Sequence, residues 1–88
     1  MEVARVIGTV VSTRKDEGLV GYKLLVLELE SVHPDRAAER LVAIDYLGAG
    51  VGERVLVTKG SGARTSLERP TPTDATVVGI IDTVDLAG

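Results

Sequence analysis

Cysteine, phenylalanine and tryptophan are absent from this 88-residue sequence, and its aromatic side chains are limited to Tyr22 and Tyr46. Without cysteine, the chain has no disulfide, no thiolate metal site and no cysteine nucleophile. The single histidine, His33, precedes Pro34 in a polar segment, with no nucleophile and orienting acid in a recognisable catalytic spacing. We therefore expect His33 to be exposed to solvent, and the protein to have no catalytic residues, no metal site and no cofactor.

The sequence also lacks an excess of basic residues. Lysine and arginine number 10 against 13 aspartates and glutamates, which gives a net charge of −3. A nucleic-acid-binding surface is normally basic, because neutralising phosphates supplies most of the non-specific affinity. No apolar run approaches the roughly 20 residues that span a bilayer, and residues 1–8 lack the uninterrupted apolar stretch of a signal peptide. We expect a cytoplasmic protein that binds neither nucleic acid nor membrane.

Short valine-rich segments separated by turn residues make up most of the chain. Valine favours strands because its branched side chain suits a pleated surface. The predicted strands are residues 1–13, 19–30, 41–47, 54–59 and 75–86, and a short helix capped by Ser61 is predicted after the fourth. Five short strands with turns between them indicate one all-β domain, residues 1–88, folded as a small barrel or sandwich with a Val, Leu, Ile and Ala core.

Several of these predicted strands are apolar on both faces. In the second, one face carries Tyr22, Leu24 and Val26, and the other carries Leu25, Leu27 and Leu29. In the first, one face carries Val6 and Val10, and the other carries Val3, Ile7 and Val11. A small barrel has one interior, and a second apolar face would leave a large exposed patch, which soluble monomers rarely tolerate. We therefore predict that the outer faces are buried against other subunits.

Five motifs cover nearly the whole chain in a fixed order. They are GTVVSTRK (Gly8–Lys15), LVGYKLLV (Leu19–Val26), VAIDYLGAGVGERVLV (Val42–Val57), GSGAR (Gly60–Arg64) and PTDATVVGIIDTV (Pro72–Val84). Together they resemble the vertex proteins of carboxysomes and metabolosomes, the ethanolamine-utilisation/carboxysome vertex family. The resemblance implies a five-stranded, OB-like β-barrel with a short helix, which assembles as a cyclic pentamer. It also implies that these homo-pentamers cap the vertices of a polyhedral bacterial microcompartment, alongside hexameric shell proteins.

Two glycine-rich segments are candidates for the subunit interface or for a pore on the five-fold axis. Gly48, Gly50 and Gly52 precede a strand instead of a helix, so they do not form a dinucleotide-binding fingerprint. A tight turn that needs positive φ angles explains them, and close approach of backbones at an interface is the functional alternative. Gly60 and Ser61 are explained by ordinary turn and cap chemistry, and lining of the pore is the alternative.

Charged residues beside these segments have a structural and a functional interpretation as well. The planar fork of Arg64 suits a bidentate contact to a carboxylate across the subunit boundary. Arg14 and Lys15 are typical of a solvated turn; alternatively they contact hexamers of the shell facet, where exposed charge steers docking. Asp45 lies near the end of the third predicted strand, so we expect it to cap a turn or to make interface hydrogen bonds.

The alternative function is an OB-like module that binds single-stranded nucleic acid. Such modules stack bases on aromatic side chains in a positively charged groove. Two tyrosines and an acidic balance argue against this function. An enzyme ranks third, because a barrel of this size does not enclose a substrate.

Overall fold

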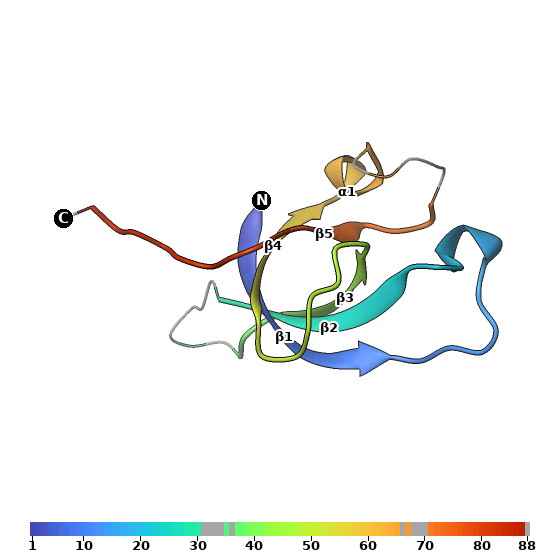
Figure 1. Ribbon diagram of the computed structural model, residues 1–88, viewed down its shortest axis with the longest axis horizontal. Coiled ribbons are helices and arrows are strands. Elements are labelled where there is room, and N and C mark those ends of the chain that lie inside the picture. The colour runs from blue at the N-terminus through green and yellow to red at the C-terminus, as the bar shows by residue number, and fades with distance from the viewer. Residues whose placement is uncertain (31–34, 36, 66, 68–70, 88) are drawn as a thin grey trace.

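Five strands close into a barrel in the computed structural model, which describes residues 1–30, 35, 37–65, 67 and 71–87 (Figure 1). The strands are β1 (Glu2–Val10), β2 (Lys23–Leu29), β3 (Arg40–Asp45), β4 (Arg54–Lys59) and β5 (Ala75–Ile80), and the helical elements are the 3-10 turn η1 (Glu17–Leu19) and the helix α1 (Ser61–Thr65). This architecture confirms the predicted five-stranded barrel with a short helix. His33, which we expected to be exposed to solvent, lies outside the described residues.

The barrel closes because β1 pairs with two strands. It runs antiparallel to β2 along most of its length and antiparallel to β4, where Glu2 lies opposite Val57. On the far side, β3 meets β5 in a short parallel contact, with Ile44 opposite Thr76. The strand order around the barrel is therefore β1-β2-β3-β5-β4.

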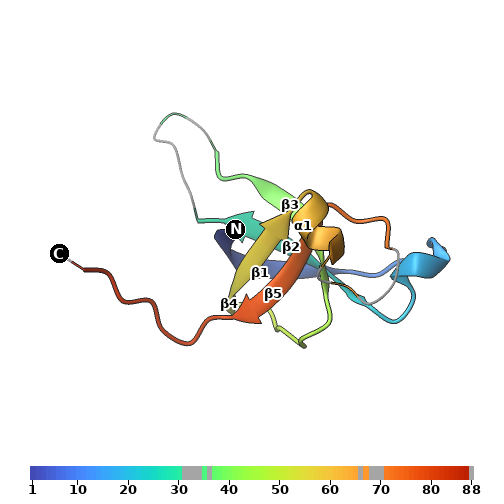
Figure 2. The same cartoon turned by 90° about the horizontal axis from the view of Figure 1, so that it is seen from above.

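Helix α1 packs against β4 and β5 (Figure 2). The buried hydroxyl of Thr76 donates a hydrogen bond of 2.8 Å to the carbonyl oxygen of the buried Ala63, which ties the helix to β5 and satisfies both polar groups. Ser61 is the first residue of the helix, and Gly60 stands before it with a φ of +67°. The prediction that Ser61 caps the helix is therefore wrong by one position, because the turn into the helix requires a conformation that glycine adopts without steric cost.

The core consists of small and medium-sized aliphatic side chains from all five strands and from the turn before β4. Its members are Ala4, Val6, Leu25, Leu27, Leu29, Ala43, Ala49, Val55, Val57, Ala75 and Val77. Each is at most 2% exposed. The composition of the core agrees with the prediction from the sequence. On β2, the structure places the face with Leu25, Leu27 and Leu29 inside the barrel, a choice that the sequence pattern left open.

A β-bulge in β1 changes which face its valines occupy. The pairing of β1 with β2 shifts by one residue at Ile7. Val6 lies opposite the inward-facing Leu27, whereas Val10 lies opposite Leu24 on the outer face. Residues directly opposite one another share a face of the sheet. The prediction that Val6 and Val10 share a face is therefore wrong, because the extra residue between them reverses the alternation.

The fifth strand is shorter than predicted. Its last pair with β4 joins Ile80 to Val55, and the final backbone hydrogen bond runs from the Ile81 nitrogen to the Arg54 oxygen at 2.9 Å. Because β4 begins at Arg54, residues 82–87 have no strand to pair with, and they extend away from the barrel (Figures 1 and 2). We call residues 82–87 the C-terminal segment.

Candidate subunit interface and pore residues

The glycine-rich turn, residues 46–53, uses backbone conformations that favour glycine. Gly48 has a φ of +90° and Gly52 a φ of +93°, whereas Gly50 does not have a positive φ. The predicted need for positive φ angles is therefore confirmed at two of the three glycines. A Cβ added at Gly48 or Gly52 would meet no atom within 4 Å. Backbone conformation, and not crowding within one chain, accordingly explains these two glycines.

Asp45 caps this turn from within the barrel wall. Its carboxylate accepts three backbone hydrogen bonds, from the nitrogens of Leu47 at 2.9 Å, Gly48 at 3.2 Å and Ala49 at 2.7 Å. The side chain is buried, with a relative exposure of 1%. A buried carboxylate is stable only when hydrogen bonds replace its lost hydration. The predicted turn-capping role of Asp45 is confirmed.

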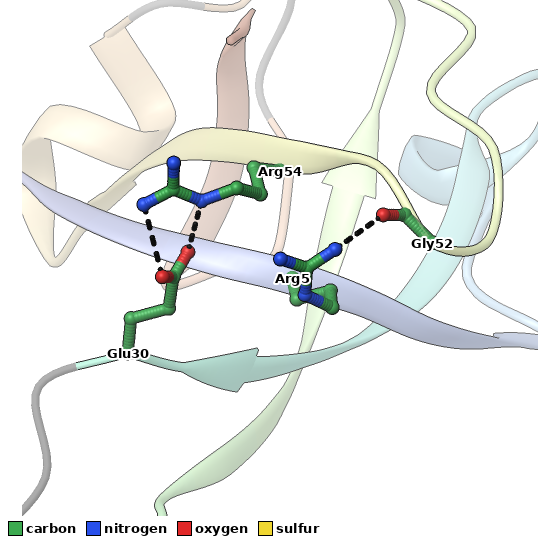
Figure 3. Close-up of polar contacts among 4 residues, drawn as sticks. All are labelled: Arg5, Glu30, Gly52 and Arg54. Carbon is green, nitrogen blue, oxygen red and sulfur yellow. Dashed lines mark hydrogen bonds and ion pairs between the residues drawn. The ribbon is translucent and has the colours of Figure 1, made fainter. Parts of the chain in front are cut away.

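Two basic side chains hold the outer side of the turn. The Lys23 Nζ donates a hydrogen bond of 2.8 Å to the carbonyl oxygen of Ala49. The Arg5 Nη1 donates one of 2.7 Å to the carbonyl oxygen of Gly52 (Figure 3). With Asp45 on the inner side, these contacts fix the backbone of the turn in one conformation and occupy two of its carbonyl groups.

A bidentate ion pair lies beside the turn on the outer surface of β4. The Arg54 Nε and Nη2 donate to the Glu30 carboxylate at 2.8 and 2.9 Å (Figure 3). The hydrogen bonds from Arg54 lower the pKa of Glu30 below its ordinary value of 4.5, and the charges of Arg54 and Arg5 act in the same direction. The pair likewise raises the pKa of Arg54. Arg5 and Arg54 lie directly opposite one another across β1 and β4, so Glu30 offsets the repulsion between them.

The second candidate segment lies at the start of α1. The Gly60 nitrogen donates a hydrogen bond of 2.8 Å to the carbonyl oxygen of Asp74, which fixes the backbone that leads into the helix. The exposed Arg64 donates from Nη1 to the carbonyl oxygen of Thr73 at 3.2 Å. No carboxylate pairs with Arg64 within the described part of the chain. Its predicted pairing across a subunit boundary stays a prediction.

Arg14 and Lys15 lie in the exposed turn between β1 and η1. The hydroxyl of Ser12 donates a hydrogen bond of 2.7 Å to the Arg14 carbonyl oxygen. The Lys15 Nζ donates one of 3.0 Å to the Ser12 carbonyl oxygen. Both side chains are exposed, which agrees with the solvated turn predicted here. Contact with a shell facet stays a prediction.

The candidate residues therefore occupy three separate places. The glycine-rich turn leads into β4 and α1 follows it, so the six residues of that strand separate the two segments by about 20 Å. Arg14 and Lys15 are at a third place, beyond the end of β1 (Figure 1). The structure does not bring the predicted residues into one site.

Large apolar side chains are exposed over much of the surface of the single chain. Those at least 37% exposed are Met1, Ile7, Val11, Val20, Val42, Tyr46, Leu47, Val51, Val84 and Leu86. Three of them, Tyr46, Leu47 and Val51, belong to the glycine-rich turn. Two of the ten, Ile7 on β1 and Val42 on β3, lie in strands, as the two-sided strands predicted, and the others lie at the N-terminus, in turns or in the C-terminal segment. They are the features that glycine patterns alone did not identify.

The described residues include no cluster of three or more His, Cys, Asp or Glu side chains able to hold a metal ion. Over the same residues, neither helical element is long and apolar enough to cross a membrane. The described surface has hydrogen-bonded turns, exposed apolar side chains and charged side chains, features that suit contacts between proteins.

Comparison with known proteins identifies the family of this fold. The family model described as "Ethanolamine utilisation protein EutN/carboxysome" matches residues 1–82. The chain is 49% identical over 88 residues to the bacterial microcompartment shell vertex protein GrpN of Rhodospirillum rubrum, covering 97% of each protein. It is 47% identical over 88 residues to the carboxysome shell vertex protein CcmL of Synechocystis sp., covering 99% of this chain and 88% of that protein.

Solved structures agree with the sequence match. The pentameric microcompartment shell protein GrpN from Rhodospirillum rubrum superposes with a TM-score of 0.80 at 46% identity, covering 100% of both chains. The ethanolamine utilization protein EutN from Escherichia coli superposes with a TM-score of 0.84 at 40% identity, covering 100% of this chain and 92% of that one. The chain therefore belongs to the EutN/carboxysome family of microcompartment shell vertex proteins.

Proposed function

We propose that five copies of this chain form a ring that closes a corner of a bacterial microcompartment shell in the cytoplasm. The observation that carries the proposal is the likeness to pentameric GrpN, which spans both chains completely at 46% identity. The work of such a ring is geometric. A flat sheet of six-fold units closes into a polyhedron only where five-fold units supply curvature, so no bond is made or broken.

The surface of the single chain supports assembly. Val42 is 48% exposed on β3, and Leu24 and Val26 are only partly buried on the neighbouring β2. An isolated 88-residue barrel buries only about 60–65% of its unfolded surface. Covering outward-facing aliphatic side chains with the next copy contributes about 25 cal/mol for each Å² removed from water. Contacts between subunits therefore add stability that the small core does not supply alone.

The two glycine-containing segments remain the candidates for the interface between copies and for a pore on the axis. Gly48, Gly50 and Gly52 present a fixed backbone next to exposed apolar side chains, which suits a subunit interface. Gly60, Ser61 and Arg64 lie beyond the other end of β4, about 20 Å away. A single constriction on the axis would be lined by one segment, and the other would face a neighbour.

Arg14 and Lys15 remain the candidates for contact with hexameric shell proteins. They are exposed at the far end of β1, and exposed charge accelerates and orients docking more than it strengthens binding. Replacing Arg14 with glutamate should slow the association of the ring with shell hexamers at low salt. An unchanged association rate, measured by surface plasmon resonance with an Arg54→Gln control, would remove Arg14 from the contact.

Native mass spectrometry of the purified chain tests the ring directly. The expected species has a mass of about 46 kDa, five times the 9.2 kDa of one chain. A single species of 9.2 kDa at micromolar concentration would contradict the proposal. Co-expression with shell hexamers, followed by electron microscopy, tests its role: shells made without this protein should have open corners. Binding of single-stranded nucleic acid has no support among these relatives, which are shell vertex proteins.

A further inference from the structure

The C-terminal segment, residues 82–87, follows β5 and has no neighbouring strand among those that the structure describes. Every residue in it is exposed, Leu86 to 89% and Val84 to 42%. Among the described residues, none of the six makes a hydrogen bond or ion pair with the rest of the chain. Its apolar side chains alternate with Thr83 and Asp85, as in a strand that lies on an apolar surface. An exposed extended segment of this kind is suited to pairing with another chain.

A groove at the opposite end of the barrel combines apolar side chains with basic ones, which complements the apolar and acidic side chains of the C-terminal segment. It lies between the end of β1 and the start of β2 and has a volume of about 290 Å³. Its lining includes the apolar or aromatic Val10, Val11, Tyr22 and Leu24 and the basic Lys15 and Lys23. The bulge at Ile7 is what directs Val10 outward, onto the same face as Leu24. We call this the β1–β2 groove.

The edge of β1 beside this groove is open. β4 accompanies β1 only as far as Arg5, and the turn before β4 adds backbone hydrogen bonds only at Val6. β1 then continues to Val10 with β2 on one side alone. On the other side, no strand from the described part of the chain lies beside residues 7–10. An extended peptide can add to such an edge through main-chain hydrogen bonds, while side-chain pockets give specificity.

Charge and length match the segment to the groove. Asp82 and Asp85 make the segment acidic, whereas Lys15 and Lys23 make the rim of the groove basic. Neither lysine pairs with a carboxylate among the described residues; both donate to backbone carbonyls. Seven extended residues, 81–87, span about 23–25 Å, which equals the 24 × 23 Å cross-section of the molecule. The segment is therefore long enough to cross a neighbouring barrel.

The segment lies at one end of the long axis of the molecule, and the end of β1 that borders the groove lies toward the other (Figure 1). A segment that points away from its own groove meets the groove of another copy instead. A contact between two different surfaces is head-to-tail, and it generates a closed ring when the rotation between copies closes. A two-fold dimer, in contrast, requires the same patch on both subunits.

We propose that the C-terminal segment of one subunit binds the β1–β2 groove of the next copy and pairs with the open edge of its β1. This proposal rests on the ring described under Proposed function and identifies the contact that links its subunits. The apolar Val84 and Leu86 pack on Val10 and Val11, and the two aspartates approach the lysines at the rim.

Shortening the chain tests the contact. A variant that ends at Ile81 keeps every strand and loses only the segment, so its circular dichroism spectrum should match that of the full chain. The concentration at which the ring dissociates, measured by native mass spectrometry, should rise about tenfold or more. Leu86→Asp should raise it similarly. Thr83→Asp, on the other face of the same segment, should change it much less.

The same measurements separate the two proposals. If the full chain is a monomer, the ring itself is refuted. If the full chain is a pentamer and the variant ending at Ile81 dissociates at the same concentration, the ring stands and the docking of the segment is refuted.

Cross-linking identifies the groove. Because the sequence has no cysteine, Leu86→Cys combined with Val11→Cys introduces the only two thiols. Oxidation should give a ladder of covalent species up to five chains on a non-reducing gel. The matched pair Leu86→Cys with Val42→Cys, on the outer face of β3, should stay at one chain. A ladder from the Val42 pair instead, or from neither pair while the pentamer is intact, would overturn the assignment to the β1–β2 groove.

Discussion

Replacing Asp45 with alanine should remove the internal cap of the glycine-rich turn. The buried N–H of Ala49 would lose its acceptor, at a cost of about 1–3 kcal/mol, and the partly exposed N–H groups of Leu47 and Gly48 would regain water, at about 0.5–1 kcal/mol each. The total is about 2–5 kcal/mol. A domain of 88 residues has about 4–13 kcal/mol of stability, so this one change would remove a large part of it.

Urea denaturation followed by circular dichroism measures this loss. The protein concentration must be fixed, because the stability of an oligomer depends on it. The matched control is Asp16→Ala, since Asp16 caps η1 with one exposed hydrogen bond of 2.8 Å, to the Gly18 nitrogen. The control should lose about 1 kcal/mol or less. A loss for Asp45→Ala below about 1 kcal/mol, or equal to that of the control, would refute the view that buried hydrogen bonds hold this turn.

Three further changes test other parts of the structure. Gly52→Ala places a side chain on a residue with a φ of +93° and should lower the free energy of unfolding by about 1–2 kcal/mol, whereas Gly50→Ala lacks that penalty. Equal shifts in the urea midpoints of the two variants would contradict this explanation of the turn. Because Arg54 lowers the pKa of Glu30, Glu30 contributes stability above its unfolded pKa near 4.5, and this contribution is lost as the pH falls through the lower folded pKa. Thermal melts of Glu30→Gln should therefore differ from those of the parent at pH 7 and converge with them as the pH falls through the lowered folded pKa of Glu30. A difference that does not depend on pH would count against the pair. Leu25→Asp places an unpaired charge in the barrel core and should cost several kcal/mol, so the expected result is insoluble or unfolded protein; a soluble, folded variant with the parent circular dichroism spectrum would show that Leu25 is not inside.

Local patterns in the sequence were sufficient to predict the barrel strands and the turn at Asp45. Period-two alternation predicted that Leu25, Leu27 and Leu29 share one face of β2, and that face is buried in the barrel. The positive φ angles of the glycine-rich turn follow from three closely spaced glycines next to a strand. In these cases, the residues that determine the structure are adjacent in the sequence.

The errors came from features that depend on distant partners. The bulge at Ile7 reversed the faces of β1, and its one local signal was Gly8, since a glycine within a strand often marks a bulge. The end of β5 was predicted too late because Val84 and Leu86 continue the alternation of a strand. Alternation indicates an extended chain with an apolar face, but a strand ends where its neighbour ends, here at Arg54.

The predicted interface residues were located by glycine and charge patterns, and the structure distributes them over three places. Glycine marks backbone conformation, so it identified the turn but not the apolar side chains around it. The exposed Tyr46, Leu47 and Val51 distinguish that turn from an ordinary surface loop, and their exposure depends on the closed barrel behind them. Sequence alone does not reveal which apolar side chains remain outside a core of this size.

The pairing of β1 with two strands also determines when the protein can complete its fold during synthesis. β1 and β2 leave the ribosome close together, but β4 follows β1 by roughly 50 residues, which takes about 3–10 s at 5–20 residues per second. A hairpin forms within about 1–10 μs, so the paired β1 and β2 wait for most of that time with one side of β1 uncovered. Closure of the barrel therefore occurs only after β4 has been synthesised, and the nascent chain is more prone to aggregation before that point.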